Sequence, residues 1–298
     1  MTAPDFRCSL AALDLGEPMT GTASTVRAFL LVEAPGAWGV DAVAGARLPS
    51  DVRTLLSGLG RNGVRVLMIR DHRRRTPETV RVFAAYVGAD RPWVETAELP
   101  DVRELLDLRL AGLGAGESPG MAPHDGPLFL VCTHGKHDAC CAERGRPLCR
   151  AMHDVAPEET WEVSHIGGDR FAPNLLVLPH GLYYGRLDPS DAASFVDVHM
   201  AGELDLAHLR GRSSFGFRVQ AAETFLRTHT GERGLAAPEL LAHERDGDVT
   251  RVELRLAGRR WAVRVATRRT PARQLTCRAV SSSEALEHSL LGIDPLDG

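Results

Sequence analysis

Residues 129–141 read FLVCTHGKHDACC, and four of the chain's six cysteines lie between positions 132 and 149. The apolar run that ends at Cys132 is typical of a short buried strand, and the polar, glycine-containing stretch after it predicts a loop. Cys141 follows nine residues later, where a helix is expected to begin. A strand, a loop of thiols and a helix together indicate an α/β unit that carries a metal or cluster site at a strand end.

Residues 161–169, WEVSHIGGD, predict a second strand that ends in a glycine turn. This turn carries His165 and Asp169, four positions apart. Imidazole and carboxylate groups beside two thiols are suitable metal ligands. Strands hold such side chains in fixed positions, and the loops that follow let them converge. The candidate cofactor-binding and metal-binding residues are therefore Cys132, Cys141, His165 and Asp169.

The predicted elements occur twice in the same order: strand, helix, three strands, helix. The first set has strands at 28–33, 64–69, 80–87 and 93–99 with helices at 49–60 and 101–113, and the second has strands at 128–132, 160–165, 175–178 and 182–186 with helices at 142–153 and 190–204. A Gly/Pro-rich stretch at 114–126 separates them. This order predicts an internal duplication of thioredoxin-like units. Superposing the first strands puts Glu33 in the place of Cys132, so only the second unit can hold the site.

Residues 206–298 predict a different module. Predicted helices at 215–229 and 237–243 precede strands at 250–256 and 261–267, which form a hairpin. Helices followed by a hairpin suggest a winged-helix-like arrangement. The arginines of the hairpin are interpreted as a solvated face and not as a phosphate-binding surface, because arginine is the common cation throughout this chain.

The predicted fold class is α/β (α+β), with two tandem thioredoxin-like units followed by a small α+β C-terminal module. Three domains are expected. They are an N-terminal thioredoxin-like domain without cofactor at 1–120, a thioredoxin-like ferredoxin domain with the cluster site at 121–205, and a helical and β-hairpin module at 206–298.

Composition restricts the class of protein. The net charge of −4 indicates neither nucleic acid nor an anionic membrane as a partner. Apolar residues make up 44 % of the chain, and no apolar run approaches the length of a membrane span, so a soluble, cytoplasmic protein is expected. In that compartment clustered cysteines indicate metal-binding or redox chemistry. Cys8 is interpreted as a lone reduced thiol, and Cys149 as a packing residue inside a helix.

At these residues the sequence resembles the sucrase/ferredoxin-like family, whose ligand domain is a thioredoxin-like ferredoxin. The resemblance covers about residues 8–205. The motifs that carry it are CTHGKHDACC at 132–141, HIGGDRFA at 165–172, NLLVLP at 174–179 and GLYYG at 181–185, with EPM at 17–19 and LVEAPG at 31–36. The resemblance implies a two-iron two-sulfur (2Fe-2S) cluster, held by a cysteine pair on one side and, in the eukaryotic branch, by an H-x-x-x-H pair on the other.

Carried over by position, this resemblance makes Cys132 and Cys141 the cysteine pair and His165 the first histidine. Asp169 replaces the second histidine and is the leading candidate for the fourth ligand. Alternatives for the fourth ligand are Cys140, His134, His137 and His180. A further alternative has Asp169 hydrogen-bonded or paired with Arg170 from outside the ligand set. Vicinal cysteines point in opposite directions in most backbone conformations, which disfavours Cys140 and Cys141 binding one cluster.

The expected function is that of an electron-transfer or redox protein that carries this cluster and meets a redox partner protein, with no membrane and no nucleic acid involved. No pair of carboxylates facing across a sugar cleft stands out, so sucrose hydrolysis is not supported and a non-catalytic electron carrier is favoured over an enzyme. The alternatives are a zinc site or a thiol switch in a regulatory protein with a winged-helix-like C-terminal module.

Overall fold

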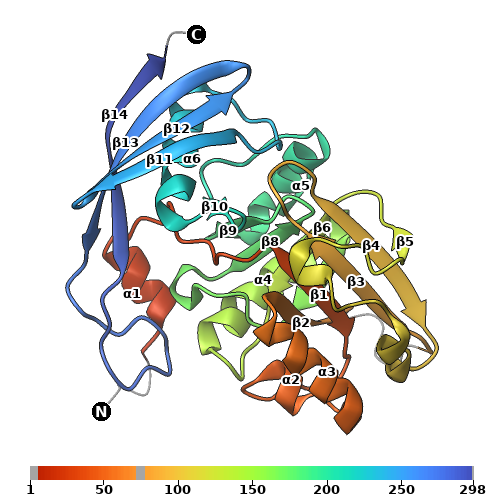
Figure 1. Ribbon diagram of the computed structural model, residues 1–298. Helices are drawn as coiled ribbons and strands as arrows, with labels where there is room; N and C mark the ends of the chain where they lie inside the picture. The colour runs from red at the N-terminus through yellow and green to blue at the C-terminus, as the bar shows by residue number, and fades with distance from the viewer. Residues whose placement is uncertain (1–5, 72–77, 297–298) are drawn as a thin grey trace.

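The computed structural model describes residues 6–71 and 78–296, and it contains one large mixed sheet and one small antiparallel sheet (Figure 1). The large sheet has ten strands in the order β10-β9-β8-β6-β7-β2-β1-β3-β4-β5, and the small sheet has four in the order β11-β12-β13-β14. Helices lie between the strands of the large sheet in sequence, so the fold is a mixed α/β one.

The first half of the large sheet is built around β1, whose six residues are all buried. Its strand β1 pairs parallel with β2 and antiparallel with β3, and β3 pairs antiparallel with β4. The elements of this half are β1 (Ala28–Glu33), α2 (Ala42–Gly45), α3 (Ser50–Arg61), β2 (Val64–Arg70), β3 (Val80–Tyr86), β4 (Trp93–Leu99), the 3-10 helices η1 (Val102–Asp107) and η2 (Leu113–Ala115), and β5 (Ala122–Pro123).

The second half repeats this pairing. Its strand β6 pairs parallel with β7 and antiparallel with β8, and β8 pairs antiparallel with β9. The elements are β6 (Leu128–Cys132), α4 (Ala139–Val155), β7 (Thr160–Val163), η3 (Asp169–Phe171), β8 (Asn174–Leu178), β9 (Leu182–Gly185), η4 (Pro189–Asp191), α5 (Ala192–Met200) and β10 (Leu209–Arg212).

The two halves join at β2 and β7, which pair antiparallel through Ile69 with Val163 and Arg70 with Glu162. Because side chains alternate between the faces of a strand, each central strand serves two cores. Phe29 and Leu31 of β1 belong to one core that runs through both halves. Alternate residues of β1 face the helix α3, and alternate residues of β6 face α4 and α5.

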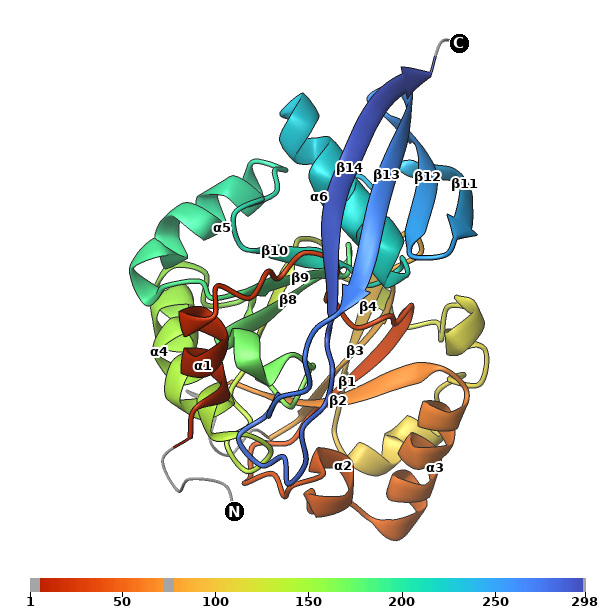
Figure 2. The same ribbon diagram turned by 90° about the vertical axis from the view of Figure 1, so that its left-hand side faces the viewer.

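The C-terminal module packs one helix on the small sheet, as Figure 2 shows. Its elements are α6 (Phe217–Thr230), β11 (Glu239–Asp246), β12 (Val249–Leu256), β13 (Arg259–Arg269) and β14 (Leu286–Leu296). The segment 270–285 between β13 and β14 runs away from this sheet and returns to it, passing the N-terminal helix α1 (Cys8–Asp14) (Figure 2).

Two predicted helices are wrong. Residues 101–113 form two short 3-10 helices, and residues 237–243 lie largely in β11, where Glu239 pairs with Arg255 of β12. Both segments carry helix-compatible residues, but β11 gains a full ladder of backbone hydrogen bonds from the neighbouring hairpin, and such tertiary pairing outweighs weak local propensity. With α6 the sole helix of the described part of 206–298, the winged-helix-like arrangement is wrong as well.

Six elements have no counterpart in the sequence prediction: α1, α2, β5, η3, β10 and β14. The remaining predicted strands and helices are present, with ends shifted by a few residues. Across residues 6–71 and 78–296, no helix combines the length and the apolar character that crossing a membrane would require.

Candidate metal centre

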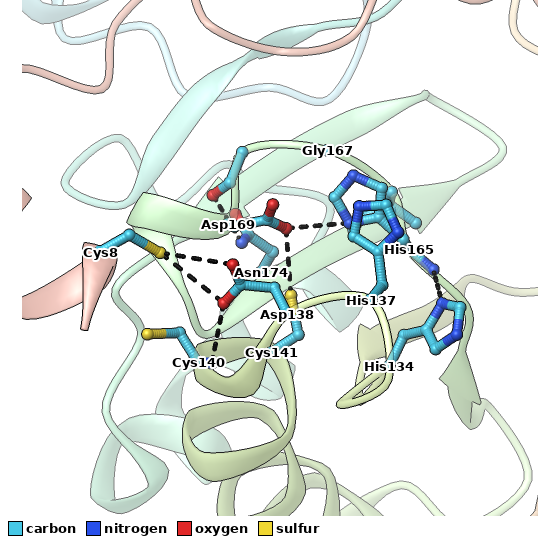
Figure 3. Close-up of polar contacts among 12 residues, drawn as sticks. Cys8, His134, His137, Asp138, Cys140, Cys141, His165, Gly167, Asp169 and Asn174 are labelled. Carbon is cyan, nitrogen blue, oxygen red and sulfur yellow. Dashed lines mark hydrogen bonds and ion pairs between the residues drawn. The ribbon is translucent and has the colours of Figure 1, made fainter. Parts of the chain in front are cut away.

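The candidate ligands come from the ends of two parallel strands. Cys132 is the last residue of β6 and pairs with Val163, the last residue of β7, so both chain segments leave the sheet at the same edge. The loop after β6 leads to Asp138, whose carboxylate accepts the Cys140 backbone N–H at 2.9 Å and caps α4. Cys141 lies in the first turn of that helix, directly beneath the loop (Figure 3).

A glycine lets α4 approach the end of β6. A Cβ atom on Gly145 would lie 2.0 Å from the carbonyl oxygen of Cys132, so no other residue fits there without a backbone shift. The helix therefore packs with its backbone against the strand that carries the first thiol. This close packing holds the two cysteines at a fixed separation.

The four predicted ligands converge, as Figure 3 shows for Cys141, His165 and Asp169. The donor atoms of Cys132, Cys141 and His165 all lie within 4.8 Å of one another. Oδ1 of Asp169 lies 3.2 Å from Sγ of Cys141 and 2.9 Å from Nδ1 of His165. The contact between His165 and Asp169 is close but not aligned as a hydrogen bond, and Nδ1 has no other hydrogen-bond partner in the described residues.

The site is deeply buried on its thiol side and open on its histidine side. Cys132 and Cys141 are each 1 % exposed, and Asp169 is 4 % exposed. The side chain of His165 is 22 % exposed. It lines an open pocket of about 390 Å³ together with His137 and residues of the first half of the sheet.

Ionisable side chains with shifted pKa values are concentrated at this site. A hydrogen bond from Cys141 and the nearby His165 hold the pKa of the Cys132 thiol well below its ordinary value, while the bond to Cys132 and burial raise the pKa of Cys141. Burial alone would lower the pKa of His165, but its contacts with Asp169 and Cys132 raise it to about 9. Burial opposes charge on Asp169, yet His165 lowers the pKa of that carboxyl. Cys132, His165 and Asp169 thus favour the charged forms of one another.

The loops of the site are held by the first half of the sheet. Nδ1 of His134 accepts the His165 backbone N–H at 3.2 Å, and Nε2 of the same ring lies 2.6 Å from the carbonyl oxygen of Gly39. Arg65 donates to the carbonyl oxygen of His165 at 2.9 Å. The N-terminal half, which has no thiol near this edge, therefore positions the His165 turn.

The structure separates the alternatives for the fourth ligand. His137 stacks on His165, with ring centroids 3.6 Å apart, and its ligand atom groups with those of His165 and Asp169. Both ring nitrogens of His134 already have partners. His180 belongs to no group of potential ligands in the described residues. Arg170 does not pair with Asp169; its Nε donates to Glu17 at 2.8 Å.

Cys140 points away from Cys141, as expected for vicinal cysteines, and contacts Cys8 and Cys277 instead. The interpretation of Cys8 as a lone thiol is therefore wrong. Cys277 was not identified as a functional candidate, because a single cysteine in an irregular segment carries no spacing signal. Cys149 packs among apolar side chains beneath the sheet, as predicted.

The donor set fits a metal centre. Two buried thiols, an imidazole and a buried carboxylate are suitable ligands for iron in an iron–sulfur cluster or for zinc. A buried carboxylate needs a partner, and within the described structure Oδ1 of Asp169 contacts the thiol of Cys141 and Nδ1 of His165. A bound cation would take the place of protons on these groups, since ligands coordinate in their deprotonated form.

Comparisons with known proteins found similar solved structures and one matching family. The wild-type thioredoxin-like [2Fe-2S] ferredoxin from Aquifex aeolicus is 20 % identical over 29 % of this chain and 97 % of its own, with a TM-score of 0.25. A second structure of a thioredoxin-like [2Fe-2S] ferredoxin from that organism is 18 % identical over 30 % and 94 %, with a TM-score of 0.26. No curated protein matches. The family model described as sucrase/ferredoxin-like matches residues 19–211, and this chain therefore belongs to the sucrase/ferredoxin-like family.

Proposed function

We propose that this protein is an electron carrier that holds a two-iron two-sulfur cluster through Cys132, Cys141, His165 and Asp169. The observation that carries the proposal is the convergence of these four side chains from two strand ends and one helix start. Membership of the sucrase/ferredoxin-like family supports it. When bound, such a cluster accepts and returns one electron.

The protein's own residues would tune and protect that centre. The buried thiols exclude water from one side, and His134 and Arg65 fix the turn that presents His165. A neutral imidazole in place of a thiolate raises a cluster's reduction potential, whereas a carboxylate returns negative charge and lowers it. The combination of His165 and Asp169 should give a potential between those of all-thiolate and bis-histidine centres.

The exposed histidine side is the proposed exit for the electron. His165 is the one proposed ligand with appreciable exposure, and it opens on the pocket described above. A redox partner protein would approach there, because electron transfer needs a short path from the cofactor to the partner.

A second candidate is a zinc site. A single tetrahedral zinc ion holds its ligand atoms about 3.3–3.8 Å apart, which is close to the 3.2 Å from Cys141 to Asp169. A cluster that spans two irons needs more room between its two ligand pairs. Compactness therefore favours zinc, while the family favours the cluster.

The deciding experiment is anaerobic expression followed by iron, sulfide and zinc analysis and a visible spectrum. The proposal expects a reddish-brown protein with about two irons and two sulfides per chain. Cys132→Ser and Cys141→Ser should remove the colour, whereas Cys149→Ser, a buried thiol outside the site, should keep it. The zinc site would be established instead if the protein stays colourless after reconstitution with iron and sulfide and contains zinc that the Cys132→Ser variant lacks.

The fourth ligand has its own test. Asp169→Ala should shorten the lifetime of the cluster and change its spectrum, and Asp169→His should restore a cluster with a raised potential. If Asp169→Ala leaves spectrum, potential and lifetime unaltered, the carboxylate is not a ligand. His137, which groups with His165 and Asp169, would then be the residue to exchange.

We also propose that the two halves of the large sheet arose by duplication of a thioredoxin-like unit, with domain boundaries near residues 120 and 205. The identical strand order and pairing senses in β2-β1-β3-β4 and β7-β6-β8-β9 support this. Glu33 ends β1 as Cys132 ends β6, and its carboxylate accepts the Arg81 backbone N–H at 2.9 Å. An experimental structure in which the halves fail to superpose would contradict the duplication.

A further inference from the structure

A second cluster of thiols lies on the other side of the α4 N-terminus. It consists of Cys8, Cys140 and Cys277 with Asp138, and their ligand atoms all lie within 4.8 Å of one another. The members come from three distant segments: the start of α1, the start of α4 and the segment 270–285 between β13 and β14. Figure 3 shows the contacts of Cys8 and Cys140 with the carboxylate of Asp138.

The distances suit a single metal ion. Sγ of Cys277 lies 3.5 Å from Sγ of Cys8 and 3.4 Å from Sγ of Cys140, and the carboxylate oxygens of Asp138 lie 3.7 and 3.8 Å from Sγ of Cys8. Tetrahedral zinc with Zn–S bonds of about 2.3 Å has sulfur–sulfur edges of about 3.7–3.8 Å. A disulfide needs about 2.05 Å, and all of these cysteines are free.

The carboxylate of this cluster is fully oriented. One oxygen of Asp138 accepts the Cys140 backbone N–H at 2.9 Å, and the other accepts the Cys277 backbone N–H at 2.7 Å. Each carboxylate oxygen keeps a second lone pair for a cation. Ser9 adds a hydroxyl donor to Sγ of Cys140 at 3.2 Å, which favours the deprotonated sulfur that a metal requires.

Burial makes the cluster a closed site. Asp138 is 0 % exposed, Cys8 and Cys140 are each 1 % exposed, and only Cys277 is partly open to solvent. Structural zinc sites are closed in this way, with four protein ligands and no position left for substrate. Three thiols and one carboxylate make a complete tetrahedral set.

We propose that Cys8, Cys140, Cys277 and Asp138 form a structural binding site for a thiophilic divalent cation such as zinc. The ion would link the N-terminal helix and the segment 270–285 to the first turn of α4. This site does not depend on the proposed function of the first one, because the two share no ligand.

The test uses the full chain with Cys132→Ser and Cys141→Ser, which lacks the thiols of the first site. Titration with zinc chloride should give about one tightly bound ion per chain. Cobalt chloride should give the charge-transfer and visible bands of tetrahedral thiolate coordination. A further Cys277→Ser change should weaken zinc binding more than about tenfold, and a further Cys149→Ser change should leave it unaltered.

A second measurement distinguishes the loss of a zinc ligand from misfolding of the variant. In the otherwise unaltered chain, Cys277→Ser should remove one equivalent of zinc while the absorption and metal content of the first site stay constant, with an unchanged far-UV circular dichroism spectrum. Hydrogen exchange should rise in segment 270–285. The proposal is overturned if the folded protein binds no zinc or cobalt in this background, if Cys277→Ser leaves binding intact, or if purified protein contains a disulfide among these three cysteines.

Discussion

Glu223 should be the most costly side chain to neutralise where the C-terminal module meets the large sheet. Its carboxylate on α6 lies 3.2 Å from Nη2 of Arg212 on β10 and 3.0 Å from Nε of Arg227 on its own helix. All three residues are at most 2 % exposed. Burial opposes its charge, but the two guanidinium groups hold the pKa of Glu223 below its ordinary value. One anion therefore balances two buried cations.

Glu223→Gln keeps the shape of the side chain and removes this charge. Removing one partner of a buried ion pair destabilises proteins by roughly 3–5 kcal/mol, because the remaining charge stays uncompensated. Both guanidinium groups retain backbone carbonyl partners, such as Leu235 for Arg212 and Ala236 for Arg227. We therefore expect the low end of that range, a loss of roughly 3 kcal/mol in the free energy of unfolding.

Urea unfolding at pH 7.5, followed by circular dichroism, measures this loss. The matched control is Glu143→Gln, since Glu143 pairs with Arg7 at 2.7 Å on the surface, with side-chain exposures of 50 % and 31 %. An exposed pair contributes about 0–1 kcal/mol, so the control should change little. Equal losses for the two variants, or a loss below about 1 kcal/mol for Glu223→Gln, would refute the reasoning.

Two more predictions concern the large sheet. Burial lowers the pKa of His199, which lies 2.9 Å from the Tyr184 hydroxyl, to about 4. In the unfolded chain this imidazole binds a proton near its ordinary pKa of about 6.5, whereas in the folded chain it stays neutral until about pH 4. The free energy of unfolding is therefore unaffected by His199 above about pH 6.5, and it falls by roughly 3 kcal/mol as the pH is lowered to about 4. Urea unfolding at several pH values should show that the His199→Gln variant lacks this pH-dependent loss. Gly145→Ala should cost about 1–3 kcal/mol and reduce the content of the proposed cofactor by displacing Cys132. Gly58→Ala, whose Cβ would lie in ordinary contact 3.9 Å from Nη2 of Arg61, should stabilise slightly.

The central strands of the large sheet were predictable because several of them are continuous apolar runs. The runs at 28–33 and 128–132 are buried on both faces, and such strands stand out in sequence without alternation. The strand β11 does not stand out, because none of its eight residues is β-branched and none is buried. Its position depends on pairing with β12. Local pattern cannot supply that partner.

The convergence of the first group of potential ligands was predictable for a related reason. Cys132 ends β6 and His165 lies two residues beyond the end of β7, so the parallel pairing of these strands brings both to one edge of the sheet. The cluster around Cys277 was not predictable in this way. Cys8 and Cys277 are 269 positions apart, and the segment that carries Cys277 leaves one sheet to reach the edge of another. Nothing in the periodicity of either neighbourhood indicates that return.

The first turn of α4 explains why two adjacent cysteines belong to two different groups of potential metal ligands. Successive side chains on a helix point about 100° apart, so Cys141 faces the core of the sheet while Cys140 faces Cys8. Asp138 caps the same turn and binds the Cys277 backbone with its second oxygen. A metal ion in the second site would thus fix the turn that presents Cys141. Loss of Cys277 should then loosen the geometry of the first site without removing any of its ligands, and its effect should be seen as faster loss of the first site's cofactor at unchanged initial content.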